Sequence, residues 1–436
     1  MTDLAQSEVA VNADALPLSI SARLGCLQFH LSGKFRVLQC ADVQDSSRVS
    51  KDTIRLIASA CDAVRPDLVV FTGNQIAGYD KIFSRTFKRR NWQESSSLSF
   101  ADKQNLKEKV RETIAQITEP LEKRSIPWVV TYGNHDFQCG LSNEELDEVY
   151  QEFPCCMNRS SVNKSTKKTK SAMQSTNCVL PKQIIFPCEP GSFAFPVKDE
   201  KQDKVVFSIV LVDSGDYCKN GGYGKPSKQS LDFIEDLHTF LPKRICVFQH
   251  FPLQQYHRVL REVPQDLAAR ESAIEGYRSF AGRYYILDEN YVLPDGYLGE
   301  GISCSDEDSG EYDSLVKAGA FAVVTGHDHR NSFAAVEPEN NMMFISTPTC
   351  GFASYGPEPS KRGVRLLEFD IRHPFEPRTQ ILEFGDLVGK PSDKKAYTYG
   401  LTAESEHDMP EVDLLRKPSL FVRFIRRWKQ HFRDKK

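Results

Sequence analysis

The sequence predicts an α/β protein in which short buried strands alternate with helices. Residues 35–41 are an apolar run that ends at Asp42, and residues 67–72 form a second run that ends at Gly73-Asn74. A segment with helical spacing lies between them. Strand, helix and strand at this pace indicate parallel strands joined by right-handed crossovers. With 436 residues, 40% of them hydrophobic, the chain can bury a large core.

The first half of the chain continues this alternation. Ser50 is a good N-cap for the first expected helix, and Pro66 ends that helix. Residues 104–124 have a helical composition, and residues 127–132 form the next expected strand, which ends at Gly133-Asn134-His135-Asp136. The apolar residues of the first helix recur with helical spacing at Ile54, Ile57, Cys61 and Val64.

The second half of the chain contains further expected strands, and each of three of them ends at an Asp or His residue. We expect strands at 205–212, ending at Asp213, at 245–249, ending at His250, and at 321–325, ending at Gly326-His327-Asp328-His329. A helix is expected near 227–239. Two more strands, near 342–347 and 364–370, are expected to be antiparallel and to close the sheets.

Changes in composition divide the chain into segments. Residues 158–177 are rich in Ser, Thr, Asn and Lys, which predicts a flexible polar loop. Residues 255–310 are mixed in character and are expected to form a cap-like insertion over the site. The predicted segments are an N-terminal lead-in (1–33), a main domain (34–372), a C-terminal extension (373–415) and a tail (416–436).

The tail differs from the rest of the chain. It carries nine Lys and Arg residues and one Asp, whereas the whole chain has a net charge of −3. A basic amphipathic helix of this kind favours an anionic membrane surface or an acidic partner. The alternative is packing against the acidic remainder of the same chain. The apolar residues that fall on one face of the expected helix are Leu420, Phe421, Phe424, Ile425, Trp428 and Phe432.

The net charge and the cysteine content indicate which partners and which cellular compartment to expect. The balanced charge gives the body no nucleic-acid footprint. The 12 cysteines follow no regular spacing, so we expect mostly reduced thiols. The N-terminus has no basic region before an apolar run, so no secretory signal is expected. We therefore expect a cytoplasmic protein, with peripheral membrane attachment through the tail as the alternative.

Five strand ends deliver residue types that bind metal ions. The carboxyl ends of strands at one edge of an α/β sheet are where sites form. Carboxylate, amide and imidazole ligands together suit Zn, Fe or Mn. The motifs are Asp42-Val43-Gln44, Gly73-Asn74, Gly133-Asn134-His135-Asp136, His250 and Gly326-His327-Asp328-His329.

In this order the motifs resemble those of the calcineurin-like metallophosphoesterase superfamily. The resemblance covers about residues 34–370. Within this superfamily, the sequence most resembles the single-domain phosphohydrolases that are similar to purple acid phosphatases. It implies a four-layer α/β/β/α sandwich of two mixed β-sheets flanked by helices. It also implies a hydrolase of phosphate mono- or diesters with a binuclear metal centre of Mn, Fe or Zn, in which a metal-bound hydroxide attacks phosphorus.

The resemblance also implies a role for each site residue. Asp42 and His329 would hold one metal, and Asn134, His250 and His327 the second, with position 74 as the bridge. His135 would stabilise or protonate the leaving oxygen and would be held by Asp136. Asp213, Arg330 and Asn331 are further candidates for substrate binding.

Two positions depart from the family pattern. Gln44 stands where His is usual, and Asn74 stands where the bridging Asp is expected. A neutral amide bridges two metal ions poorly, so we expect weaker metal binding, with a single bound ion as one possibility, and reduced activity. The alternative is a pseudoenzyme of the same fold that acts as a binding or scaffold protein.

Overall fold

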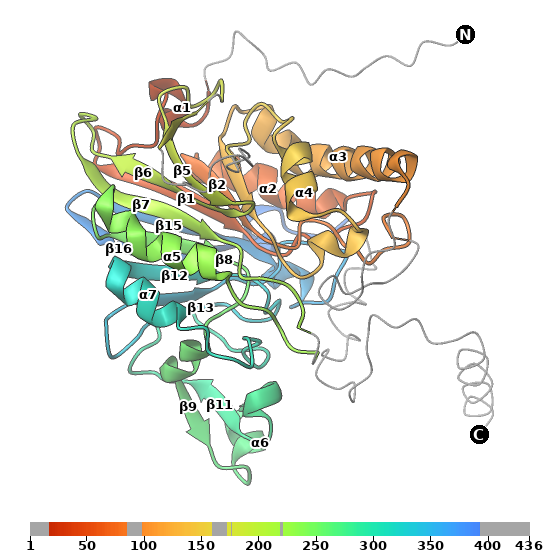
Figure 1. The fold of residues 1–436 in the computed structure, drawn as a ribbon. Coiled ribbons are helices and arrows are strands. Elements are labelled where there is room, and N and C mark those ends of the chain that lie inside the picture. The colour runs from red at the N-terminus through yellow and green to blue at the C-terminus, as the bar shows by residue number, and fades with distance from the viewer. Residues whose placement is uncertain (1–16, 85–97, 159–171, 176, 219–220, 393–436) are drawn as a thin grey trace.

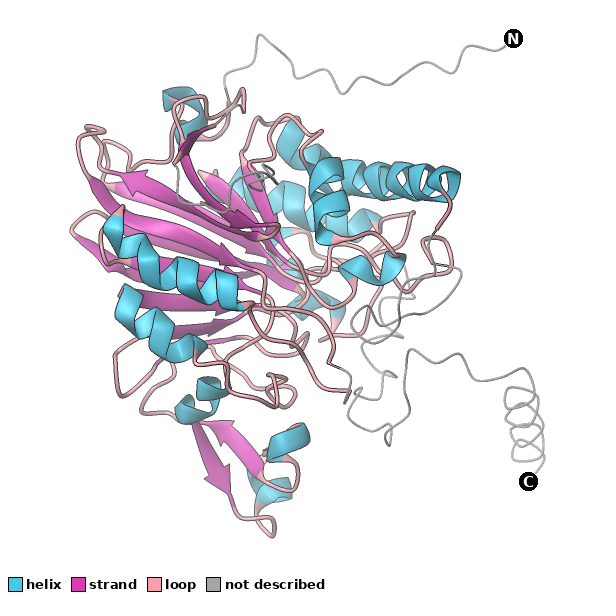
Figure 2. Cartoon of the chain, in the orientation of Figure 1, coloured by secondary structure: helices cyan, strands magenta, loops and turns pink. Residues whose placement is uncertain are grey.

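The protein is built from two large β-sheets with helices on their outer sides (Figure 1). The computed structural model describes residues 17–84, 98–158, 172–175, 177–218 and 221–392. The predicted tail helix and most of the polar loop lie outside the described residues. Figure 2 shows the strands of both sheets running side by side between the helices.

The first sheet has five strands in the order β16-β15-β1-β2-β3. Strands β1, β2 and β3 are parallel, and β15 pairs with β1 in the antiparallel direction. The parallel arrangement predicted from the sequence is therefore confirmed for this sheet. The strand bounds are β1 Lys34–Cys40, β2 Leu68–Thr72, β3 Trp128–Thr131, β15 Gly363–Asp370 and β16 His373–Glu383.

The second sheet has eight strands in the order β13-β14-β12-β8-β7-β6-β5-β4. Its centre is parallel, because β8 pairs in parallel with both β7 and β12, and β12 pairs in parallel with β14. The flanking strands are antiparallel. The bounds are β4 Met173–Gln174, β5 Ile184–Glu189, β6 Ser192–Lys198, β7 Val205–Val212, β8 Ile245–Gln249, β12 Ala320–Thr325, β13 Phe333–Val336 and β14 Met343–Ser346.

Three hydrophobic clusters separate four layers. Alternate side chains of a strand point to opposite faces of its sheet. On β2, Val70 faces the cluster between the sheets, whereas Phe71 faces the cluster under the first helical layer. On β7, Ile209 faces the cluster between the sheets and Val210 the cluster under the second helical layer. The predicted α/β/β/α sandwich is confirmed.

The helices begin where the sequence provides caps. The Ser50 hydroxyl accepts from the Asp52 N–H at the start of α2, and Ser142 and Glu145 form a capping box at α4. None of the described helices is long and apolar enough to span a membrane. The bounds are α1 Ile20–Leu24, α2 Lys51–Val64, α3 Phe100–Glu122, α4 Asn143–Tyr150, α5 Lys228–Asp236, α6 Ala268–Glu271, α7 Glu311–Ala318 and α8 Phe384–Leu387.

The structure corrects several sequence boundaries. The extension expected from residue 373 begins with β16, which pairs with β15 and belongs to the first sheet. The expected lead-in contributes Phe29, which is fully buried between the sheets. The strand near 342–347 is antiparallel to β13 but parallel to β12. Strands β5, β6, β13 and β16 were not predicted, because their residues form no clear run between turn signals.

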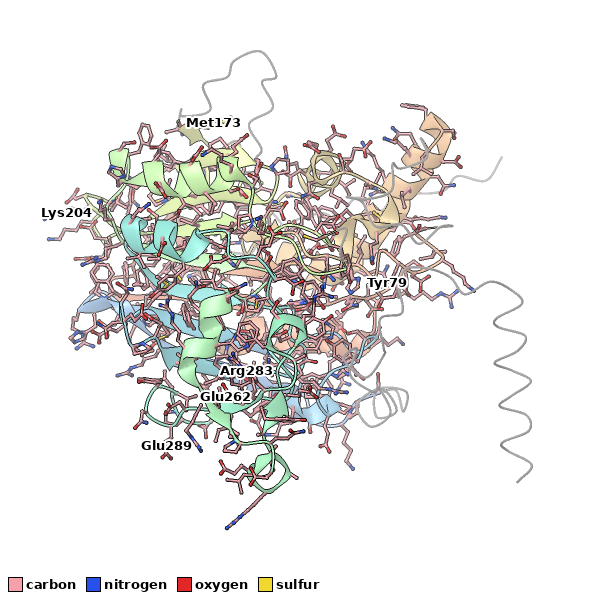
Figure 3. All side chains as sticks on the ribbon, turned by 60° about the horizontal axis from the view of Figure 1, so that its bottom comes forward. Tyr79, Met173, Lys204, Glu262, Arg283 and Glu289 are labelled. Atoms are coloured by element: carbon pink, nitrogen blue, oxygen red, sulfur yellow. The ribbon has the colours of Figure 1, made fainter. Side chains whose placement is uncertain are left out.

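The segment 255–310 contains a small third sheet. Its order is β10-β11-β9, with bounds β9 Leu260–Val263, β10 Ile274–Glu275 and β11 Tyr284–Leu287. Figure 3 labels Glu262 and Arg283 on this sheet, and their side chains pair at 3.3 Å. The small sheet projects from the body of the molecule (Figure 1). The segment is therefore structured, and its role as a cap over the site stays a prediction.

A stability prediction follows from the core between the sheets. Phe207 is fully buried and makes ring contacts with Phe29, Phe35 and Phe369. We expect Phe207→Ala to lower the free energy of unfolding by about 3–5 kcal/mol, because it leaves a cavity in this core. Urea denaturation measures the change. Phe240→Ala is the control, since Phe240 is 49% exposed. Equal effects of the two variants would contradict the assignment of the core.

Candidate functional site

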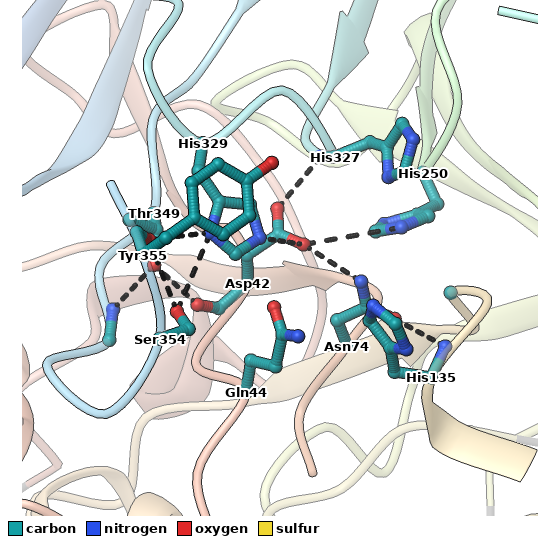
Figure 4. Close-up of polar contacts among 12 residues, drawn as sticks. Asp42, Gln44, Asn74, His135, His250, His327, His329, Thr349, Ser354 and Tyr355 are labelled. Atoms are coloured by element: carbon teal, nitrogen blue, oxygen red, sulfur yellow. Dashed lines mark hydrogen bonds and ion pairs between the residues drawn. The ribbon is translucent and has the colours of Figure 1, made fainter. Parts of the chain in front are cut away.

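The predicted site residues lie together where the parallel strands end (Figure 4). Asp42, Gln44, Asn74 and His327 all have positive φ, at 51°, 41°, 54° and 70°. Non-glycine residues adopt this left-handed conformation at a cost, and such residues gather at functional sites. The chain therefore leaves these strands through tight, strained turns that direct the side chains to one place.

Asp42 is the carboxylate at the centre of the site and is fully buried. Its Oδ2 accepts from the backbone N–H of His327 at 2.7 Å, and its Oδ1 lies 3.4 Å from His329 Nε2 and 4.0 Å from His250 Nε2. Burial would raise the pKa of Asp42, but His250, His329 and the His327 N–H together lower it below its usual value. Asp42 is therefore an anion surrounded by imidazoles.

His250 and Asn134 direct acceptor atoms at each other. The ring Nδ1 of His250 lies 2.8 Å from the carbonyl oxygen of Thr72, which can only accept, so we assign the proton to Nδ1. Burial lowers the pKa of His250 to about 4, so the ring is neutral near pH 7. Its Nε2 lone pair then lies 3.0 Å from Asn134 Oδ1, another acceptor. Two acceptors this close need a cation or a proton between them.

His329 and Asp42 form a second pair of the same kind. Nδ1 of His329 lies 2.8 Å from the Tyr355 carbonyl oxygen, and its ring stacks on the Tyr355 ring with centroids 4.2 Å apart. Burial lowers the pKa of His329, but Asp42 more than compensates, and the result lies above the usual value. His329 Nε2 therefore faces Asp42 Oδ1. The ring is either protonated, or it is neutral with a bound cation between these two atoms.

His327 completes the group of imidazoles. Its ring lies between aromatic neighbours, with centroids 4.4 Å from Tyr223, 4.7 Å from Phe251 and 4.9 Å from His250. The aromatic contacts fix the orientation of this ring near the ring of His250.

His135 is held by Gln138, and the expectation that Asp136 holds it is wrong. The ring Nδ1 of His135 lies 2.7 Å from Gln138 Oε1, and the ring packs edge-on against Tyr79 at 4.9 Å. Burial lowers the pKa of His135 to about 4. With Nδ1 donating to Gln138, the Nε2 atom of the neutral ring carries the lone pair.

Asp136 organises the backbone. Its carboxylate accepts four N–H groups, from Asn74 at 2.7 Å, Gln75 at 2.8 Å, Gly133 at 2.9 Å and Ile76 at 3.2 Å. Burial nevertheless raises the pKa of Asp136 to about 7. Asp136 thus joins the loops that follow β2 and β3 and positions Asn74 through its backbone.

Asn74 lies between the two acceptor pairs. Its Nδ2 donates to Asp42 Oδ1 at 3.0 Å and to Asn134 Oδ1 at 3.1 Å. Its Oδ1 accepts from the His135 N–H at 2.8 Å. The amide thus turns its donor face, not its oxygen, toward the centre of the site.

The two acceptor pairs can each bind a metal ion. The amide of Asn74 cannot bridge two such ions, because it presents N–H groups to them. The pair of Asn134 and His250, and the pair of Asp42 and His329, present the ligand atoms that Zn, Fe and Mn use. An N–H group cannot coordinate a cation. Among the described residues, no three His, Cys, Asp or Glu side chains converge as a ready metal site.

Gln44 lies on the Tyr79 side of the site. Its Nε2 donates to the Tyr79 hydroxyl at 3.0 Å, and its buried Oε1 has no hydrogen-bond partner among the described residues. Figure 4 shows its amide directed toward the space below Asp42. Gln44 can therefore offer one acceptor atom to a ligand.

The three candidates for substrate binding lie in different surroundings. Asp213 accepts from Asn143 Nδ2 at 2.6 Å and lines a cavity of about 380 Å³ with Asp216 and Phe137. Asn331 is fully buried, and its Oδ1 accepts from the N–H groups of Gly299 and Glu300. These contacts give Asn331 a role in shaping that loop.

Arg330 lies at the edge of the site. Its guanidinium lies 5.6 Å from the centroid of the Tyr355 ring, which in turn stacks on His329. Its backbone N–H donates to Glu300 Oε1 at 2.9 Å. Substrate binding by Asp213, Arg330 and Asn331 stays a prediction.

Four aromatic and amide residues of the site lie outside the motifs singled out above. Gln138 contacts His135 from the turn that continues the Gly133-Asn134-His135-Asp136 motif, Tyr79 contacts Gln44 and His135, and Tyr355 stacks on His329. Tyr217 places its hydroxyl 2.5 Å from Asn134 Nδ2. Its position after the strand end at Asp213 was the available signal.

Comparison with known proteins places the chain in a family. The profile of the calcineurin-like phosphoesterase family matches residues 35–331. The protein therefore belongs to the calcineurin-like phosphoesterases. The match covers all five strand ends of the site.

Individual relatives are distant. The chain is 22% identical to a protein of Arabidopsis thaliana named "Probable inactive purple acid phosphatase 29", over 81% of this chain and 82% of that one. It is also 22% identical to "Phosphatase DCR2" of Saccharomyces cerevisiae, over 69% of this chain and 45% of that one.

Solved structures give weak overlaps. A dimetal phosphatase from Danio rerio has a TM-score of 0.39 at 10% identity, over 80% of this chain and 99% of that one. The purple acid phosphatase PPD1 from yellow lupin has a TM-score of 0.40 at 12% identity, over 88% of this chain and 57% of that one.

The buried neutral His250 predicts a loss of stability in acid. Its pKa of about 4 lies below the ordinary value near 6.5, so the folded state binds fewer protons than the unfolded chain. The stabilisation is present above pH 6.5 and is lost as the pH falls toward 4. In chelator, we expect His250→Gln to reduce the fall in unfolding free energy between pH 6.5 and 4.5 by about 2 kcal/mol.

The matched control is His238→Gln, because His238 is exposed in the short 3-10 helix Leu237–Thr239 that follows α5. Denaturant unfolding at both pH values gives the comparison. The same slope in wild type and His250→Gln would show that His250 does not contribute.

Proposed function

We propose that this protein hydrolyses phosphate mono- or diesters at the strand-end site. The observation that carries the proposal is the convergence of five separate strand ends on one buried group of residues. That group keeps Asp42, Asn134, His135, His250, His327 and His329 of the family pattern, and family membership supports phosphoester chemistry in general.

His135 is the residue proposed to exchange a proton with the ester. Its Nδ1 is occupied by Gln138, which leaves Nε2 for the substrate. Alone it is neutral near pH 7, since burial lowers its pKa to about 4. A phosphate anion bound beside it would favour the protonated ring, from which Nε2 can donate to the leaving oxygen.

Metal ions are the proposed cofactors. Asn134, His250 and His327 would hold one ion and Asp42 with His329 another, Gln44 lying beside Asp42. When bound, such an ion neutralises charge on the phosphoryl oxygens and acidifies water. The chain's own contribution is a buried, ordered set of imidazoles and one carboxylate. We propose Mn, Fe or Zn, with incomplete occupancy because Asn74 supplies no bridging oxygen.

The second candidate is a pseudoenzyme of the same fold. Asn74 favours it, and the Arabidopsis thaliana relative carries the words "probable inactive" in its name, whereas the Saccharomyces cerevisiae relative is named a phosphatase. In this case the same site would bind a phosphate ester or a partner without turnover.

We further propose that the protein works in the cytoplasm, at an anionic membrane surface or on an acidic partner. All twelve cysteines are free thiols, and most of them are buried, which suits a reducing compartment. The basic composition of residues 416–436 supports the attachment.

The test of the proposed activity is hydrolysis of an aryl phosphate and its diester with added Mn²⁺, together with metal analysis of the purified protein. We expect turnover that His135→Ala reduces about 10²-fold or more, because the proton donor is lost. His238→Ala is the control and should keep full activity. Turnover no faster than buffer, with one metal or none per chain, would favour the pseudoenzyme.

The tail makes a separate prediction. We expect deletion of residues 416–436 to abolish sedimentation with vesicles rich in phosphatidylserine. Each Lys or Arg near such a surface contributes about 1 kcal/mol of attraction. Neutral phosphatidylcholine vesicles are the control. Absence of binding by the full-length chain, or unchanged binding after the deletion, would exclude membrane attachment through the tail.

A further inference from the structure

The side chain of Asn74 makes three hydrogen bonds. One goes to the loop after β1, and two go to the loop after β3. The Nδ2 atom reaches Asp42, after β1, and Asn134, after β3, while Oδ1 accepts from the His135 N–H. Asn74 itself follows β2. One side chain therefore connects the ends of three adjacent parallel strands.

The orientation of this amide is fixed. Its oxygen is held by a backbone N–H, which cannot act as an acceptor, so a flipped amide would place two donors against each other. The backbone N–H of Asn74 is held by Asp136 at 2.7 Å. Gly133 packs so closely that an added Cβ there would lie 2.3 Å from Asn74 Oδ1. The donor face must therefore point at Asp42 and Asn134.

A carboxylate at position 74 would have no hydrogen to donate to Asp42 and Asn134. Asn74 is 1% exposed and Asp42 is fully buried. Aspartate at position 74 would place a carboxylate oxygen where Nδ2 now lies, about 3 Å from Asp42 Oδ1. Two buried carboxylates in contact cannot both stay ionised without a cation between them. Aspartate thus makes the assembled site depend on a cation, whereas asparagine satisfies the same acceptors with its own hydrogens.

We infer that Asn74 is an internal hydrogen-bond cross-link that keeps the strand-end site assembled without a bridging metal ion. Each N–H of the amide occupies a lone pair that a bridging centre would otherwise use. Any metal ion that binds at the remaining acceptor pairs is then an exchangeable ligand and not a structural part of the fold. This inference does not require the protein to be a hydrolase.

The experiment compares the thermal unfolding midpoint of wild type and Asn74→Asp in EDTA and in Mn²⁺, with Mn²⁺ binding measured by titration calorimetry. We expect wild type to unfold cooperatively in EDTA, and we expect Mn²⁺ to raise its midpoint by less than it raises the midpoint of Asn74→Asp. We expect Asn74→Asp to lose about 5–10 °C in EDTA and to recover most of it in Mn²⁺. It should also bind at least one more Mn²⁺ per chain than wild type.

Asn158→Asp is a closely matched control. Asn158 is fully buried, its Oδ1 accepts from the Val130 N–H at 2.8 Å, and its Nδ2 donates to Asp147 Oδ1 at 3.1 Å. The substitution therefore creates the same kind of buried carboxylate pair in another place. We expect it to lower the midpoint equally in EDTA and in Mn²⁺, without added metal binding.

Two results would overturn the inference. One is a wild-type protein that is unfolded or loses its cooperative transition in EDTA, because the native fold would then depend on metal. The other is an Asn74→Asp variant that responds to Mn²⁺ no more than Asn158→Asp does. If Asn74→Asp does not fold in either condition, the wild-type comparison alone decides. Neither readout is activity, so failure of the proposed hydrolysis leaves the inference standing.

Discussion

The site depends on how the buried loops after the strands satisfy their polar groups. Where a strand ends inside the molecule, its N–H groups lose their ladder partners, and leaving them unpaired is costly. Two carboxylates solve this problem. Asp136 accepts four backbone N–H groups from the loops after β2 and β3, and Asp42 accepts the His327 N–H from the loop after β12. The Asp136 bonds join two loops of the first sheet, and the Asp42 bond links the first sheet to the second at the edge where the site lies.

The imidazoles depend on the same arrangement. His250 and His329 each direct Nδ1 to a backbone carbonyl, which leaves Nε2 facing the site. Burial keeps His250 neutral, and Asp42 favours the charged form of His329. Two rings with the same backbone contact therefore have pKa values shifted in opposite directions. Burial dominates at His250, 4.0 Å from Asp42 Oδ1, whereas at His329, 3.4 Å away, Asp42 and Glu300 together outweigh burial.

Asn74 determines whether the loops at the centre of the site need a cation to hold them together. An aspartate at position 74 would place a second buried carboxylate against Asp42 and require a cation there, whereas the amide satisfies Asp42 and Asn134 with its own N–H groups. At this one position, a nitrogen atom in place of an oxygen therefore decides whether the connection between the loops depends on a cation. The aromatic residues Tyr79, Tyr217 and Tyr355 border the site through contacts with Gln44, Asn134 and His329.

The sequence by itself determined the alternation of elements, the parallel strands β1, β2, β3, β7, β8 and β12, and the residues that end them, because these features are written in local periodicity and in motifs. Only the tertiary structure decided that β16 extends the first sheet and that Gln138, not Asp136, holds His135. It also decided which face of the Asn74 amide points inward. Those outcomes depend on partners distant in sequence, such as Asp42, Asn134 and the His135 N–H, whose positions no local pattern specifies.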